Sequence, residues 1–120
     1  MWARLTDEGE RDDLSLAPAL GGAGLAAMVL AHLVWDPALT LLGVAAFGVG
    51  EEDAAFVRAL LAVHPALWLG AKVLYVGGGA AVLYRTGAYR TPMAAVLLWA
   101  VAVYGVVAPL GWLELLLGVR

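Results

Sequence analysis

Three apolar runs, each long enough to cross a lipid bilayer as a helix, constrain this chain more than any other feature. They cover about residues 25–47, 65–84 and 92–117, and a spanning helix needs roughly 20 apolar residues. Hydrophobic residues make up 63% of the 120 residues and the mean hydropathy is +0.88, more than a soluble domain can bury. The sequence predicts an all-α integral membrane protein with about three transmembrane helices, arranged up-down-up.

The segments outside these runs are polar or amphipathic. Residues 1–15 are rich in carboxylates and show little apolar periodicity, which predicts a solvated acidic tail ahead of one transmembrane domain over residues 16–120. Residues 54–64 repeat large apolar side chains at i, i+4 and i+7. That spacing is typical of a short amphipathic helix lying at the membrane interface.

Pro37 lies inside the first run and leaves two topologies open. It removes a backbone donor and frees the carbonyl of Leu33, which kinks a helix. In the alternative, Asp36 caps a new helix, residues 16–35 span the membrane alone, and residues 37–49 form a half-helix. We favour the kinked single helix, because proline is tolerated within spanning helices.

Asp36 and Lys72 are ionisable residues inside apolar runs. On insertion scales each costs on the order of 2.5–3.5 kcal/mol at the centre of a spanning helix. Counting along straight helices puts Lys72 near the depth of Asp36 and Thr40, so an ion pair is the least costly arrangement. Ionisable residues at this depth indicate function, but a pair that only fixes helix register explains the same pattern.

Further polar residues extend this pair into an intramembrane polar seam. His32, Asp36 and Thr40 follow one another at intervals of four, which stacks them on one face of a helix like a relay. Tyr104 of the third run comes level with Lys72. The predicted seam therefore comprises Asp36, Lys72, Thr40, His32 and Tyr104.

Three consecutive glycines, Gly77, Gly78 and Gly79, interrupt the second run. They lack the spacing and the preceding strand of a phosphate-binding loop. Small residues let the backbones of neighbouring spanning helices approach closely, and residue counting places the triplet opposite Trp35 and Asp36. We expect a role in helix packing.

An acidic loop of Glu51, Glu52 and Asp53 follows the first run. A surface metal site that adds His64 is conceivable, but carboxylates in loops are more often only solvated. His32 lies about 20 Å from His64 along the membrane normal, too far for both to bind one haem. The chain has no cysteine, and its one serine lies in the tail. We therefore predict no catalytic residue, no metal and no cofactor.

These motifs are similar to those of a family of small prokaryotic polytopic membrane proteins of unknown function. The family pattern is Asp-x-x-x-Thr in the first helix, an acidic residue followed by Asn-Pro, and a lysine in the next helix. The similarity covers most of residues 25–84, although Asp53 and Ala54 replace Asn-Pro. It supplies no activity. The residues it singles out for testing are Asp36, Thr40, Glu51 or Glu52, and Lys72.

The charges bear on partners and orientation. A net charge of -3 with a single lysine argues against a nucleic-acid partner, and the preference for arginine and acidic residues is typical of a high-GC, halophilic microbe. Four arginines flank the spans on the amino-terminal side of the membrane and two on the other (Arg4, Arg11, Arg85 and Arg90 against Arg58 and Arg120). The positive-inside rule then predicts a multi-pass cell-membrane protein with a cytoplasmic amino terminus.

Three classes of function fit this pattern. The favoured one is a structural or accessory subunit that binds itself or another membrane protein through Gly and Ala faces. The second is a small transporter or ion-coupling element, which we expect to be an oligomer because three helices enclose little space. A lipid-binding or lipid-modifying enzyme comes last, so we expect an enzyme less than a subunit.

Overall fold

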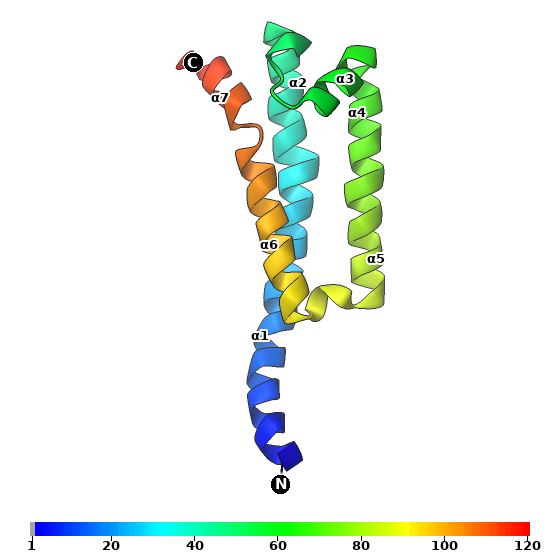
Figure 1. Ribbon diagram of the computed structural model, residues 1–120, viewed down its shortest axis with the longest axis vertical. Coiled ribbons are helices and arrows are strands. Elements are labelled where there is room, and N and C mark those ends of the chain that lie inside the picture. The colour runs from blue at the N-terminus through cyan, green and yellow to red at the C-terminus, as the bar shows by residue number, and fades with distance from the viewer. Residues whose placement is uncertain (1) are drawn as a thin grey trace.

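The computed structural model describes residues 2–120, with side-chain placement for residues 16–120. Every regular element in this part of the chain is helical. Three long apolar helices run up, down and up (Figure 1), and each is long and apolar enough to cross a membrane. The predicted all-α class with three spans is confirmed.

The first span is one continuous helical rod. It joins α1 (Trp2–Leu30), the π-helical turn η1 (Ala31–Trp35) and α2 (Asp36–Phe47), and its apolar part is Leu16–Phe47. Pro37 does not divide it. The wide turn just before the proline bonds the Asp36 amide to the Ala31 carbonyl, one residue further back than in an α-helix. The chain thus adopts the single-helix topology, with the irregularity that proline demands taken up in η1.

The backbone of α1 begins at Trp2, well before the apolar stretch. Residues 2–15 therefore continue the first span as a helix (Figure 1). The prediction that this acidic tail is solvated concerns side chains that the structure does not describe, so it stays a prediction.

A reversal made of two short helices connects the first and second spans. Gly48, at φ 87°, ends α2 in a conformation that only glycine adopts readily. The 3-10 turn η2 (Val49–Glu51) and α3 (Ala55–Val63) follow. α3 lies across one end of the bundle, between the ends of α2 and α4 (Figure 1). It turns Leu61, 2% exposed, inward and leaves Phe56 and Val63 outside.

The second span consists of α4 (Pro65–Lys72), the π-helical turn η3 (Val73–Gly77) and α5 (Gly78–Thr86). Pro65 takes the first-turn position, where a proline needs no backbone donor. The His64 ring caps this helix start, because its Nδ1 accepts a hydrogen bond from the Ala66 amide at 3.0 Å. This histidine therefore has a structural role at the helix terminus.

The third span starts after the 3-10 turn η4 (Ala88–Arg90) and contains α6 (Pro92–Val107) and α7 (Leu110–Leu117). The Thr91 hydroxyl caps α6 by accepting from the Ala94 amide at 3.2 Å. α6 ends two residues before Pro109, which has no backbone N–H to donate a helical hydrogen bond. The indole of Trp35 donates to the Val106 carbonyl at 3.0 Å, and so satisfies one of the acceptors that a helix end leaves free.

Packing is tight between the first and third spans and loose around the second. α1 and α6 lie side by side (Figure 1), with Leu25, Met28, Leu98 and Ala102 in one buried cluster that Ala80 of α5 joins. Of the most apolar stretch of each span, 39% is buried in the first, 28% in the third and 11% in the second. The second span therefore leaves most of its surface to the surroundings.

Candidate functional site

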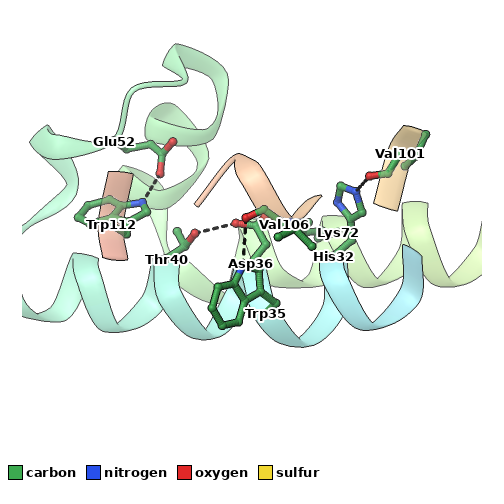
Figure 2. A network of polar contacts seen from close by, with 9 residues as sticks. All are labelled: His32, Trp35, Asp36, Thr40, Glu52, Lys72, Val101, Val106 and Trp112. Atoms are coloured by element: carbon green, nitrogen blue, oxygen red, sulfur yellow. Dashed lines mark hydrogen bonds and ion pairs between the residues drawn. The ribbon is translucent and has the colours of Figure 1, made fainter. Parts of the chain in front are cut away.

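An ion pair joins the first and second spans inside the bundle. The Lys72 ammonium contacts Oδ2 of Asp36, and the Thr40 hydroxyl donates to Oδ1 at 2.9 Å. The side chains of Lys72 and Asp36 are only 13% and 14% exposed. Both carboxylate oxygens of Asp36 thus have partners, and all three side chains meet near one point of the seam (Figure 2).

Two π-helical turns flank this pair. Asp36 follows η1 directly, and Lys72 directly precedes η3, so each charged residue sits beside a widened turn of its own helix. The two turns also contact each other. Single π turns inside α-helices occur frequently at functional sites, and here both lie where the two spans meet through charge.

The Lys72 ammonium has a second neighbour on its own helix. It lies over the ring of Trp68, 5.2 Å from the ring centroid, within the range of a cation–π interaction. Trp68 is 5% exposed, so this contact is shielded. A carboxylate and an aromatic face therefore hold the ammonium between them.

His32 belongs to a different contact from the one that its spacing predicts. Its Nε2 donates to the Val101 carbonyl of α6 at 2.7 Å, and its ring stacks on Tyr104 with centroids 6.3 Å apart. Gly105 leaves room for it, since a Cβ there would lie 2.6 Å from the imidazole. Among the described side chains no hydrogen bond links His32 to Asp36. The η1 turn between them departs from α-helical spacing, and of the three residues only Asp36 and Thr40 are hydrogen-bonded to each other.

The acidic loop is tied to the third span through Glu52. Its Oε2 accepts from the indole of Trp112 at 2.8 Å (Figure 2). Its Oε1 accepts from the Ala54 amide at 3.2 Å. Asp53 makes a looser ion pair with Arg120 at 3.5 Å. The three acidic residues thus differ: Glu52 is anchored, Asp53 meets the chain end, and Glu51 is exposed in η2.

Trp112 is a site residue that the sequence pattern does not reveal. Its position suggests an interfacial anchor, yet it is 4% exposed and packs against Gly43, where an added Cβ would overlap the indole ring. The contact joins α2 to α7. The sequence contains both residues, a glycine in one span and a large aromatic residue in another, but no motif or spacing links them.

A cavity of about 810 Å³ lies beside the ion pair. The first, second and third spans form its walls, and the loop and α3 border one end. Its lining includes the whole predicted seam together with two of the loop acids: His32, Asp36, Thr40, Lys72, Tyr104, Glu52 and Asp53. The remaining lining is largely aromatic and aliphatic.

The glycine triplet faces open space where its side chains would lie. A Cβ added at Gly77, Gly78 or Gly79 would meet no atom of another part of the structure within 4 Å. The helix-packing role expected of these residues stays a prediction: η3, which contains Gly77, contacts η1 of the first span, while the Cβ positions of all three glycines face open space.

No metal centre is formed by the described residues. Within residues 16–120 no three His, Asp or Glu side chains gather closely enough to hold an ion. His64 caps a helix, and His32 is committed to the Val101 carbonyl. The arrangement offers instead a neutralised ion pair next to a large, mostly apolar cavity.

Comparisons with known proteins add no relative. No protein-family model, curated protein or solved structure matches the chain. The three apolar spans describe a small multi-span membrane protein, and its site has to be interpreted from its own geometry.

Proposed function

We propose that this protein is a structural or accessory subunit of a membrane assembly, and that its second span binds a further helix from a second copy or from another membrane protein. The observation that carries the proposal is the 11% burial of that span, against 39% and 28% for the other two. A span with so few internal neighbours has most of its surface free for an outside partner.

The glycine triplet supports this location. Its backbone is open on the outside, and small residues on a spanning helix allow close approach and strong van der Waals contact with another helix. The exposed aromatic and aliphatic side chains before it, Leu74 and Tyr75 at 78% and 84% exposed, would then lie along the same partner.

The ion pair has a supporting role in this proposal. In lipid, apolar burial gives little drive for helices to associate, so the Asp36–Lys72 contact fixes the height at which the second span stands beside the first. The amino terminus faces the cytoplasm, as the arginine distribution favours. Asp36, Thr40, Glu52 and Lys72 all line one cavity, whereas Glu51, the alternative acidic residue of the resemblance, does not.

Native mass spectrometry of the protein in lipid nanodiscs tests the proposal. We expect a defined oligomer or a fixed complex with one other membrane protein, which Gly78→Leu disrupts. The matched control is Ala100→Leu, which adds the same side chain at an exposed position of the third span and leaves the assembly intact. A monomer released from its own membrane without any protein partner would refute the subunit function.

A second candidate function is ion coupling or transport. One observation favours it: the buried ion pair borders a cavity of about 810 Å³ rather than a packed core. Flux measurements on proteoliposomes would test it. Loss of flux in Asp36→Asn, with helix content and oligomeric state unchanged, would support transport, and absence of any protein-dependent flux in the unmodified protein would exclude it for the ions assayed.

A further inference from the structure

The cavity carries more negative than positive charge. Three carboxylates line it, from Asp36, Glu52 and Asp53, and Lys72 is the lining residue with an ammonium group. Lys72 is already paired with Asp36. Asp53 has Arg120 at 3.5 Å at the outer end.

Within residues 16–120 no ion pair reaches the Glu52 carboxylate. Both of its oxygens accept hydrogen bonds from neutral donors, the Trp112 indole and the Ala54 amide. Arg58 lies nearby, but it donates at 3.0 Å to the backbone carbonyl of Glu52 and does not line the cavity. The loop end of the cavity therefore holds a carboxylate whose two oxygens are oriented by hydrogen bonds.

Aromatic rings line part of the remaining space: Trp68 and Trp112 are buried, and three more rings lie at its exposed rim. The faces of such rings attract cations, most strongly where water is excluded. One ring of the lining already binds a cation, because the Lys72 ammonium lies over Trp68. The aromatic lining residues are Phe56, Trp68, Tyr75, Tyr104 and Trp112.

The cavity opens sideways at the depth of the spans. Tyr75 and Tyr104 line it, yet they are 84% and 67% exposed, so the cavity is open to the outside of the molecule between the second and third spans. A volume of about 810 Å³ falls within the roughly 300–1,000 Å³ typical of small-molecule sites. An occupant with an apolar body can enter from the bilayer.

We propose that this cavity binds an amphiphilic organic monocation, with Glu52 as its counter-ion and the aromatic walls around its apolar body. Tyr75 lines this cavity and also lies on the exposed face of the second span, but the counter-ion Glu52 lies in the loop, so the test at Glu52 does not depend on the subunit proposal. Its carrying feature is the combination of one uncompensated carboxylate, an aromatic lining and a lateral opening.

Tetraphenylphosphonium is a suitable probe, because tetraphenylborate has nearly the same shape and the opposite charge. Equilibrium dialysis against nanodiscs with and without the protein separates protein binding from partition into lipid. We expect saturable, protein-dependent binding of the cation and none of the anion. Equal protein-dependent uptake of both ions would overturn the proposal.

Glu52→Gln tests the counter-ion. The amide oxygen of glutamine still accepts from Trp112, so the loop contact is kept while the charge is removed. We expect the cation to bind about tenfold more weakly or worse. Glu114→Gln, which neutralises an exposed acid of α7 that does not line the cavity, should change binding less than about twofold. Unchanged binding in Glu52→Gln, with normal helix content, would refute the assignment.

The natural cation can be a free amphiphilic amine or the amine of a lipid headgroup. Nanodiscs of phosphatidylglycerol, which has no amine or ammonium group, with and without added phosphatidylethanolamine, distinguish the two. If phosphatidylethanolamine lowers the affinity for tetraphenylphosphonium, the lipid amine occupies the site. If it has no effect while Glu52→Gln still weakens binding, the site takes a free cation.

Discussion

The Asp36–Lys72 contact predicts a strongly non-additive double-mutant cycle. Both side chains are largely buried, at 14% and 13% exposed, and removing one partner of a buried pair leaves an uncompensated charge that costs about 3–5 kcal/mol. We expect Asp36→Asn and Lys72→Met each to lower the free energy of unfolding by about 3 kcal/mol. The double variant leaves no charge unpaired, so it should cost no more than about 3 kcal/mol instead of about 6.

Equilibrium unfolding by SDS in mixed micelles, followed by circular dichroism, measures these free energies. The chain contains its own control, the exposed ion pair of Asp53 and Arg120 with side chains 79% and 37% exposed. The cycle of Asp53→Asn and Arg120→Met should give a coupling energy below about 1 kcal/mol. Additive losses at Asp36 and Lys72, or equal coupling in both cycles, would refute the reasoning that burial gives this pair its strength.

Two further predictions use the same unfolding assay. Lys72→Ala leaves space beside Asp36 that opens on the cavity, so millimolar ethylammonium should restore roughly 1 kcal/mol of stability by binding the folded state. The double variant Asp36→Asn/Lys72→Ala should show no rescue. Equal rescue of both variants would exclude binding at the carboxylate. Gly43→Ala places a Cβ against the Trp112 ring and should lower the free energy of unfolding by about 1–3 kcal/mol. Gly77→Ala, in open space, should be neutral or stabilising by up to about 1 kcal/mol. A larger loss of stability in Gly77→Ala than in Gly43→Ala would contradict the packing.

The spans and the charged contact follow from properties that a sequence displays. Length and hydropathy identify three helices, because the bilayer fixes how long an apolar run must be. The cost of an isolated charge at membrane depth makes Asp36 and Lys72 partners once helix counting places them at similar heights, and the structure brings these two side chains into contact.

The rest of the site depends on contacts that no local pattern encodes. Glu52 and Trp112 are 60 residues apart in sequence, and nothing near either residue indicates the other. The orientation of His32 toward Val101 depends on the π turn that contains it. Counting residues at α-helical spacing takes no account of that turn. The cavity arises from the distance that the second span keeps from the others, a tertiary quantity that the sequence leaves open.

The same distance explains why the polar contacts matter so much here. Between helices in lipid, apolar side chains gain little by leaving acyl chains for one another, and the second span buries only 11% of its most apolar stretch. Its position is therefore set mainly by the connecting segments at its two ends and by Lys72 between them. Removing the ion pair should loosen the second span while the packed pair of α1 and α6 stays intact, so hydrogen exchange in Asp36→Asn should rise around η3 and remain unchanged around Met28 and Leu98.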